Sequence, residues 1–177
     1  FGVKPVILDP DGNEIAGAGS GNLSISGSWP GQIRTVFGDH ERCFNTYYTT
    51  YKGYYFTGDG ARRDEDGYYW HQGRVDDMLK VGGLWVSPTE IEAVLTTHEA
   101  VVECAVVGHY DHVGLLNPIA FVCLHNDIEP SDLVLGQLLK VCAKTLDAHK
   151  RPRWIEFTDD LPRTATGKLQ RFKLRKH

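Results

Sequence analysis

A lysine stands in a short threonine- and glycine-containing segment near the C-terminal end, Thr-Ala-Thr-Gly-Lys at residues 164–168. A lysine beside a glycine can bring a positive charge against a phosphate, so a phosphate-binding loop is the first hypothesis. The Walker A pattern needs a glycine where Pro162 stands and a serine or threonine where Leu169 stands. That pattern is therefore absent, and the residues alone favour a glycine turn that carries a solvated lysine, Lys168.

Asp59 has a glycine on each side, in the sequence Phe-Thr-Gly-Asp-Gly at residues 56–60. Glycine lets the backbone adopt unusual conformations and lets a ligand approach closely. A carboxylate accepts two hydrogen bonds, which suits the two neighbouring hydroxyls of a ribose. A plain Asp-Gly turn between strands is the alternative, and without further context it is the simpler interpretation.

Charged residues also gather at Gly-Arg-Val-Asp-Asp, residues 73–77, where Arg74 precedes Asp76 and Asp77. These residues put a cation and two carboxylates at a predicted domain boundary, or they form a solvated linker.

His109 and His112 lie three residues apart, but no third ligand accompanies them, and a zinc site needs at least three protein ligands. The sequence therefore predicts no metal site.

The elements that would position these residues change character near residues 75–77. Before this point the sequence predicts strands, with an Asp11-Gly12 turn near the start, an alternating strand at residues 22–26, and aromatic strands at residues 54–56 and 68–70. Asp39 is predicted to cap a short helix that reaches Tyr47. This first part is therefore expected to be β-rich.

After residue 77 the pattern predicts hairpin, helix, strand, strand, helix, strand. Gly82 and Gly83 form the hairpin turn, and Ser87 begins a capping box with a proline at the first helical position. Buried strands are predicted at residues 101–107 and 119–124, and a last strand at residues 154–157. The second helix begins at Ser131, and its apolar face is predicted to contain Leu135, Leu138, Leu139, Cys142 and Leu146. A polar, mobile tail follows.

The predicted fold class is α+β. Residues 1–75 form the β-rich part, and residues 76–177 form a small α+β domain in which helices cover a sheet. Apolar residues make up 41% of the sequence, and aromatic residues make up 11% of it. This apolar content is sufficient for a packed core. Because the chain begins with Phe1 rather than Met, we expect a fragment or processed form of a longer protein.

Charge and cysteine content exclude several classes of function. The formal net charge is −4, and neither half of the sequence is basic, so nucleic acid is not an expected partner. No run approaches the roughly 18 apolar residues of a membrane span, so no membrane partner is expected. The cysteines form no Cys-x-x-Cys pair and are predicted to be buried free thiols of a cytoplasmic protein, at Cys43, Cys104, Cys123 and Cys142.

Taken together and in order, the motifs resemble the late core motifs of the adenylate-forming superfamily, over nearly the whole chain. They are Phe-Thr-Gly-Asp at 56–59, Gly-Arg-Val-Asp-Asp at 73–77, Lys-Val-Gly-Gly at 80–83, Ser-Pro-Thr-Glu-Ile-Glu at 87–92 and Leu-Pro-Arg-Thr-Ala-Thr-Gly-Lys at 161–168. The first part resembles acetyl-CoA synthetases, as in Ser-Trp-Pro-Gly at 28–31. The second resembles benzoate-CoA ligases, as in Leu-Trp-Val-Ser-Pro at 84–88.

This resemblance implies the C-terminal fragment of an ATP-dependent acyl-CoA ligase, with the end of the large N-terminal part's barrel subdomain before a mobile C-terminal domain. It implies catalytic Lys168, ATP- or AMP-binding Asp59 and Arg74, a hinge at Asp76, and CoA binding at Gly82 and Gly83. ATP with Mg²⁺ and CoA are the expected substrates, and no tightly bound cofactor is expected. Expected partners are the missing N-terminal part, a small carboxylic acid, and a protein acetyltransferase or deacetylase that acts on Lys168.

The resemblance favours a short-chain acid such as acetate and leaves two alternatives. Acetyl-CoA synthetases usually have Gly-His-Arg where Gly83, Leu84 and Trp85 stand here, which weakens the assignment to acetate and removes one expected basic contact near the nucleotide or CoA. The first alternative is an aryl-CoA ligase that acts on benzoate-like acids. The chain could also act only as an isolated CoA-binding or interaction module. The Ser/Thr/Gly-rich phosphate loop of the superfamily is absent, so this chain alone is predicted to be inactive.

Overall fold

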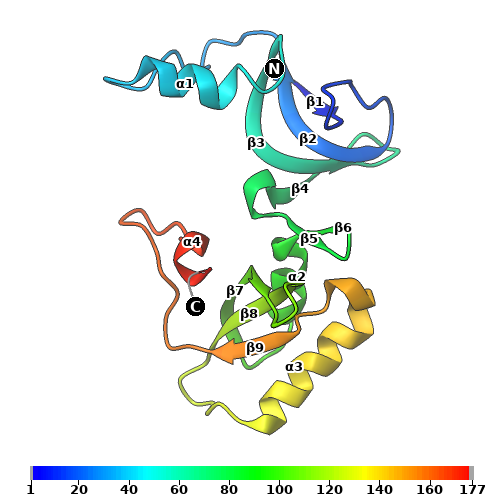
Figure 1. The fold of residues 1–177 in the computed structure, drawn as a ribbon, viewed down its shortest axis with the longest axis vertical. Helices are drawn as coiled ribbons and strands as arrows, with labels where there is room; N and C mark the ends of the chain where they lie inside the picture. The colour runs from blue at the N-terminus through cyan, green and yellow to red at the C-terminus, as the bar shows by residue number, and fades with distance from the viewer. Residues whose placement is uncertain (1, 176–177) are drawn as a thin grey trace. The chain divides into compact units, whose positions relative to one another are not determined.

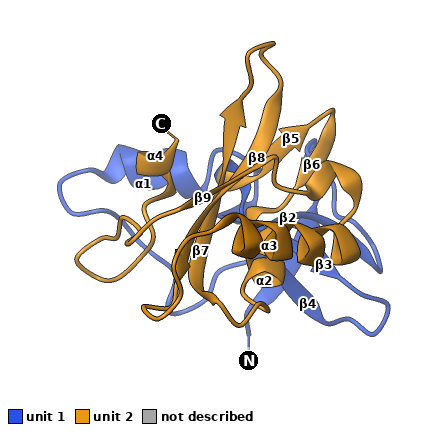
Figure 2. Ribbon diagram, turned by 90° about the horizontal axis from the view of Figure 1, so that it is seen from below, with its two compact units in different colours: residues 1–76 blue, residues 77–177 orange. Residues whose placement is uncertain are grey.

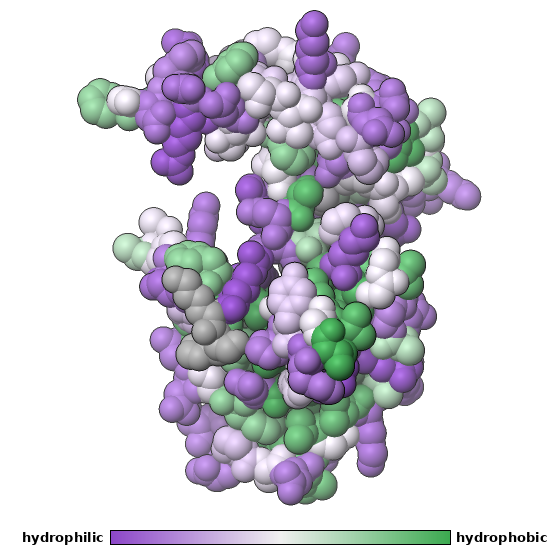
Figure 3. All heavy atoms as spheres, in the orientation of Figure 1, coloured by the Kyte–Doolittle hydropathy of each residue, from purple (hydrophilic) through white to green (hydrophobic). Residues whose placement is uncertain are grey.

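The computed structural model describes residues 2–175. The chain divides into two compact units, residues 1–76 and residues 77–177 (Figure 2). Each unit has its own sheet or sheets and its own buried residues. In the space-filling view, hydrophilic residues cover much of the face that is seen, with smaller hydrophobic areas between them (Figure 3). No helix in the described part of the chain is long and apolar enough to cross a membrane.

The first unit is a four-stranded antiparallel sheet in the order β1-β2-β3-β4, with one helix between β2 and β3 (Figure 1). The strands are β1 (Lys4–Leu8), β2 (Gly19–Ser26), β3 (Tyr54–Arg63) and β4 (Tyr69–Arg74), and the helix is α1 (His40–Tyr47). The predicted cap is confirmed, because an Asp39 carboxylate oxygen accepts a hydrogen bond from the Arg42 backbone N–H at 3.0 Å.

The second unit has the predicted hairpin, helix, strand, strand, helix and strand, and a further short helix that was not predicted follows them. A 3₁₀ turn, η1 (Val75–Asp77), precedes a hairpin of β5 (Leu79–Val81) and β6 (Leu84–Val86). There follow α2 (Pro88–Leu95), β7 (Val101–Tyr110), β8 (Leu116–Leu124), α3 (Asp132–Thr145), the 3₁₀ turn η2 (Ala148–Lys150), β9 (Trp154–Phe157) and α4 (Arg171–Leu174). Strand β8 is central, antiparallel to β7 and parallel to β9.

Alternating residues of β7 and β8 build two cores, one on each face of this sheet. Val106 and Val122 belong to the cluster that also contains buried residues of α2 and α3. Their neighbours in sequence, Val107 and Phe121, belong to a second cluster on the opposite face. Because successive side chains of a strand point to opposite faces, a strand buried on both faces must be apolar throughout.

The C-terminal tail covers the second face, which corrects the expectation of a polar tail. Leu161 and Leu174 are 1% and 8% exposed and belong to the second cluster, with Leu169 packed against it. Burying a leucine side chain contributes about 1.5–3 kcal/mol, enough to favour a packed tail. The polar residues between these leucines hid the pattern, because the leucines lie too far apart for a helical or strand period.

Two local predictions were wrong in detail. Ser87 is the N-cap of α2 and Pro88 follows it, but the Ser87 side chain makes no capping hydrogen bond, and its Oγ lies 2.8 Å from Thr89 Oγ1 instead. On α3, Leu139 is 41% exposed, whereas Val134 is buried. The buried face follows the i, i+4 spacing of Val134, Leu138 and Cys142, and Leu139 lies about 100° away from it.

Candidate functional site

Strand β3 bulges immediately before Asp59. Leu23 of β2 pairs with Asp59, and the next residue, Ser24, pairs with Phe56, so Thr57 and Gly58 have no partner on β2. Gly58 adopts φ +78°, a conformation that other residues rarely adopt. Bulges of this kind redirect the side chains that follow them.

Threonine hydrogen bonds hold the bulge closed. The Thr57 hydroxyl donates to the Leu23 carbonyl at 2.8 Å and accepts from the Asp59 backbone N–H at 3.1 Å. The backbone around Asp59 is therefore tied to β2 on one side. On the other side of β3, Asp59 pairs directly with Arg74 of β4.

Arg74 lies against the bulge and connects the predicted residues of the first unit. Its Nη1 is 3.8 Å from Asp59 Oδ1, and its Nε donates to Asp76 Oδ1 at 3.1 Å. A Cβ atom added to Gly58 would lie 2.8–2.9 Å from the Arg74 guanidinium, so only glycine leaves room for this position. The structure thus brings Asp59, Arg74 and Asp76 together in one unit.

The Asp59 carboxylate keeps its capacity to accept hydrogen bonds. Its nearest basic side-chain nitrogens, Arg74 Nη1 and His71 Nε2, are 3.8 and 3.7 Å away, beyond hydrogen-bond distance. Within residues 2–175 it accepts no hydrogen bond from a side chain or the backbone, although its side chain is only 28% exposed. A partly buried carboxylate with unused acceptor sites is suited to a ligand with paired hydroxyl groups. Neither His71 nor Thr57 was predicted, because their roles depend on strand register.

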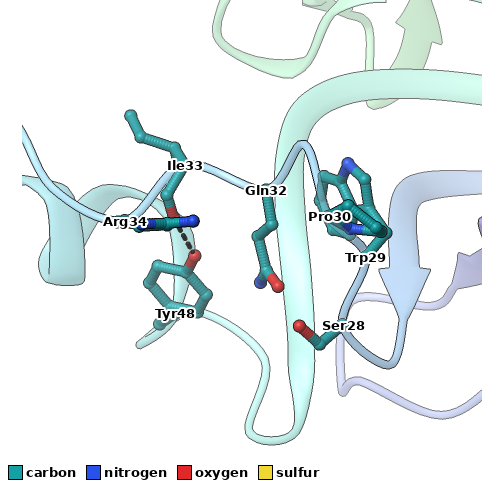
Figure 4. Close-up of a pocket in the computed structure, with 7 residues that line it drawn as sticks. All are labelled: Ser28, Trp29, Pro30, Gln32, Ile33, Arg34 and Tyr48. Atoms are coloured by element: carbon teal, nitrogen blue, oxygen red, sulfur yellow. Dashed lines mark hydrogen bonds between the residues drawn. The ribbon is translucent and has the colours of Figure 1, made fainter.

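The first unit also has an open hollow of about 540 Å³ that was not predicted. Gln32, Arg34 and Tyr48 line it, and the Tyr48 hydroxyl donates to the Ile33 carbonyl at 2.8 Å (Figure 4). Beside it the rings of Tyr48 and Tyr55 meet edge to face at 5.7 Å. Burial raises the pKa of Tyr55, so this phenol stays neutral.

In the second unit, Gly82 and Gly83 form the turn of the β5–β6 hairpin. Both have positive φ, +56° and +87°, and a Cβ atom on either would meet nothing within 4 Å. The glycines are therefore required by the turn and also leave its outer surface open. Leu84 and Trp85 follow them and are 53% and 61% exposed, with the Lys80 ammonium 5.8 Å from the Trp85 ring.

Lys168 stands at the end of a closed loop. The Thr164 backbone N–H donates to the Lys168 carbonyl at 2.8 Å, and the Thr164 hydroxyl accepts from the Lys168 N–H at 3.0 Å. Gly167 turns the chain with φ +83°. The Lys168 ammonium is exposed and makes no ion pair or hydrogen bond with any residue that the structure describes. The loop geometry is fixed while the charge is left available.

The basic residues near η2 have internal partners, which weakens them as a phosphate site. Lys150 donates to Glu90 at 2.8 Å, and this hydrogen bond raises the pKa of Lys150. Arg151 donates to two carbonyls at the end of α3, and Arg153 donates to Asp111 Oδ2 at 2.8 Å. Among residues 2–175, no group of three or more His, Cys, Asp or Glu side chains is placed to hold a metal ion.

In comparisons of sequence, most of the second unit matches a known family model. Residues 90–168 match the family described as AMP-binding enzyme C-terminal domain. The chain is 49% identical to an acetyl-coenzyme A synthetase of Saccharophagus degradans and to acetyl-coenzyme A synthetase 2 of Pseudomonas aeruginosa. Each alignment covers 99% of this chain but only 27% of the relative, so the chain spans about a quarter of these proteins.

Solved structures of related enzymes share the fold. An anthranilate CoA ligase, AuaEII, in complex with anthranoyl-AMP matches 99% of this chain with a TM-score of 0.89 at 42% identity. A benzoate CoA ligase from Burkholderia xenovorans matches 98% of it with a TM-score of 0.83 at 40% identity. This chain covers 33% and 34% of those two chains.

Proposed function

We propose that this chain is the C-terminal part of an adenylate-forming acyl-CoA synthetase. In that position it would complete the active site of an ATP-dependent acyl-CoA ligase. The reaction would join a carboxylic acid to CoA through an acyl-adenylate, with release of pyrophosphate and AMP. The observation that carries the proposal is Lys168, exposed and without a side-chain partner among residues 2–175, at the end of a closed loop in a chain 49% identical to acetyl-CoA synthetases.

Lys168 would act in the first step. An attacking carboxylate and the α-phosphate of ATP repel each other, because both are anions. An ammonium placed between them would stabilise the charge that builds up in the transition state. The rigid turn supports this role, since a preorganised cation needs little rearrangement when the reaction occurs.

The first unit would bind the nucleotide. The Asp59 carboxylate would accept both ribose hydroxyls, and Arg74, whose side chain is 51% exposed, would contact the nucleotide beside it. ATP would enter with Mg²⁺ as part of the substrate. The phosphate loop expected of the superfamily is not in this sequence, so we infer that this chain alone forms no adenylate.

CoA would bind in the second step. The open surface at Gly82 and Gly83 would let the pantetheine arm approach the backbone. Asp76, the last residue of the first unit, would be the hinge about which residues 76–177 rotate as the mobile C-terminal domain between the two steps.

Acetate or a similar short-chain acid is the proposed substrate, supported by the identity of 49% to acetyl-CoA synthetases. One observation favours an aryl acid instead, because Leu84 and Trp85 replace the His-Arg pair usual in acetyl-CoA synthetases and the aryl-CoA ligases match at 40–42% identity. Acetylation of Lys168 by a protein acetyltransferase would remove its charge and stop adenylation.

The test is ATP–pyrophosphate exchange by a full-length ligase that carries this chain as its C-terminal part. Acetate, propionate, benzoate and anthranilate are the acids to compare, and residues 1–177 alone are the control. We expect exchange with acetate in the full-length enzyme and none with the chain alone. No exchange with any acid would favour a CoA-binding module without activity. Exchange by the chain alone would contradict the proposed division of the active site.

A further inference from the structure

An ion pair with little solvent exposure joins α4 to α2 just after the Lys168 loop. Arg171 Nη2 lies 2.9 Å from Glu92 Oε1 and 2.8 Å from Glu92 Oε2, and the two side chains are only 18% and 14% exposed. Glu92 Oε1 also accepts the backbone N–H of Val106 on β7 at 2.8 Å. One carboxylate therefore connects α4 to two elements, α2 and β7, that lie far from it in the sequence.

Arg171 has a second acidic neighbour at the start of the unit. Its Nη1 is 3.6 Å from Asp77 Oδ2, and Arg175, the C-cap residue that follows α4, also pairs with Asp77. Asp77 is the first residue of the second unit. Helix α4 and the residue after it are thus fastened to the first residue of their own unit as well as to α2 and β7.

The other end of the loop is also fastened by an arginine. Arg163 pairs with Glu103 of β7, and its Nη1 donates to the Gly167 carbonyl at 2.8 Å. Arg163 and Arg171 stand five residues before and three residues after Lys168. Of the two pairs, the one at Glu92 is less exposed and has more hydrogen bonds, so its loss should move the loop more.

We propose that Arg171, held by Glu92, is a positioning residue that fixes the Lys168 loop on the second unit for the adenylation step. The inference rests on the proposed function. Arg171 touches neither nucleotide nor acid in this account and acts only through the placement of Lys168. A displacement of about 1 Å in a reacting group is enough to cost on the order of a hundredfold in rate.

The test compares Arg171→Met and Arg171→Lys in a full-length ligase that carries this chain, with Lys173→Met as the matched control. Lys173 lies on the same helix, is exposed, and has no ion pair among residues 2–175. We expect Arg171→Met to lower the kcat of adenylation on the order of a hundredfold, with little change in the KM for ATP. Arg171→Lys keeps the charge and should lose less, and Lys173→Met should behave as wild type.

Two further measurements separate positioning from a general structural role. Thioester formation from supplied acyl-adenylate should be retained in Arg171→Met. In a Lys168→Ala background, Arg171→Met should change adenylation by less than about twofold, because the group that it positions is already gone. Equal loss of both half-reactions, or an undiminished effect in the Lys168→Ala background, would overturn the proposal.

Hydrogen exchange keeps the anchoring testable even if the proposed function fails. If the wild-type ligase forms no adenylate, the proposed reaction is wrong, but the anchoring still predicts faster amide exchange at residues 163–169 in Arg171→Met than in Lys173→Met. Equal exchange in those two variants would show that Arg171 does not hold the loop.

Discussion

Asp59 in the first unit and Lys168 in the second are held in different ways. Asp59 lies on a sheet strand, 28% exposed, beside Arg74 and His71. Lys168 lies outside any strand or helix, exposed, with its ammonium unpaired among the described residues. Its backbone, however, is fixed by the Thr164 hydrogen bonds.

The difference fits two chemical tasks. A group that binds a ligand through several steps benefits from a fixed position beside other polar groups. A group that acts in one step needs a free charge on a segment that can be placed for that step and removed afterwards. We therefore expect changes at Asp59 to affect both half-reactions and changes at Lys168 to affect one.

Removing the Lys168 charge should have the largest effect. In a full-length ligase that carries this chain, Lys168→Ala should raise the barrier of adenylation by about 3–4 kcal/mol, comparable to the loss of one preorganised donor. ATP–pyrophosphate exchange measures this step, and Lys173→Ala controls for the loss of a nearby exposed lysine. Wild-type exchange in Lys168→Ala would leave the residue without a catalytic role.

Proline at position 76 tests whether the two units must move relative to each other. Proline fixes φ near −65°, so Asp76→Pro should hold one arrangement and slow one half-reaction on the order of a hundredfold while sparing the other. Both half-reactions are measured on the same preparation, with Asp76→Ala as the control for loss of the carboxylate. Equal loss of both, or of neither, would argue against a hinge at Asp76.

Asp59→Ala should weaken nucleotide binding by about 1.5–3 kcal/mol, the range for hydrogen bonds to a charged group. The expected change is a higher KM for ATP and weaker binding of AMP, measured by calorimetry. Asp64→Ala is a suitable control, because Asp64 lies in the β3–β4 turn and contacts Tyr68 and Trp70. Unchanged AMP affinity in Asp59→Ala would remove Asp59 from the nucleotide site.

Alanine at Gly58 should have a smaller effect, through Arg74. A left-handed conformation costs a non-glycine residue about 1–2 kcal/mol. The added Cβ would also displace the guanidinium, which now lies 2.8–2.9 Å from that position. We expect Gly58→Ala to lower AMP affinity and thermal stability modestly, whereas Gly60→Ala, at a glycine without positive φ, should do less. Equal effects of the two changes would contradict the bulge argument.

The reactivity of the buried cysteine thiols tests how well each face of the β7–β8–β9 sheet is covered. Of the predictions made for this protein, this one involves the smallest effect on activity. Burial, with a contribution from Glu92, raises the pKa of Cys104 to about 12, and burial also raises the pKa of Cys123. With a pKa near 12, only about one Cys104 thiol in ten thousand is ionised at pH 8, so alkylation should be very slow. Because such a thiol stays neutral when folded, its stabilising contribution should be lost as the pH rises from about 9 towards 12.

Comparing the two thiols sharpens this prediction. Cys104 belongs to the core on the α2 and α3 face, whereas Cys123 belongs to the core beneath the C-terminal tail. Mass spectrometry after iodoacetamide treatment should show Cys123 alkylated before Cys104, because the cluster beneath the tail contains fewer buried residues than the cluster beneath the helices. Denatured protein, in which all four cysteines should react, is the control. Faster labelling of Cys104 would contradict the assignment of the tail as the weaker cover.

Much of the fold could be predicted from the sequence, because its strands and helices follow local patterns. The Gly82-Gly83 turn, the Asp39 and Ser131 caps and the apolar runs of β7 and β8 have short-range signals. The packing of the tail could not be predicted, because Leu161 and Leu174 are thirteen residues apart and are brought into one buried cluster by the fold.

The candidate site could likewise be predicted only in part from the sequence. Lys168, Asp59 and Arg74 stand in recognisable motifs. The roles of their partners could not be predicted, because those of Thr57 and His71 depend on strand register and the pairing of Arg171 with Glu92 spans 79 residues. Such contacts depend on tertiary structure, so no local pattern in the sequence predicts them.

The most direct test of the account measures both half-reactions in Lys168→Ala and Asp59→Ala, side by side with the wild-type full-length ligase. ATP–pyrophosphate exchange reports adenylation, and CoA thioester formation from supplied acyl-adenylate reports the second step. We predict that Lys168→Ala loses exchange but keeps thioester formation, and that Asp59→Ala is impaired in both. Impairment of both steps by Lys168→Ala, or of neither, would contradict the claim that this lysine serves adenylation alone.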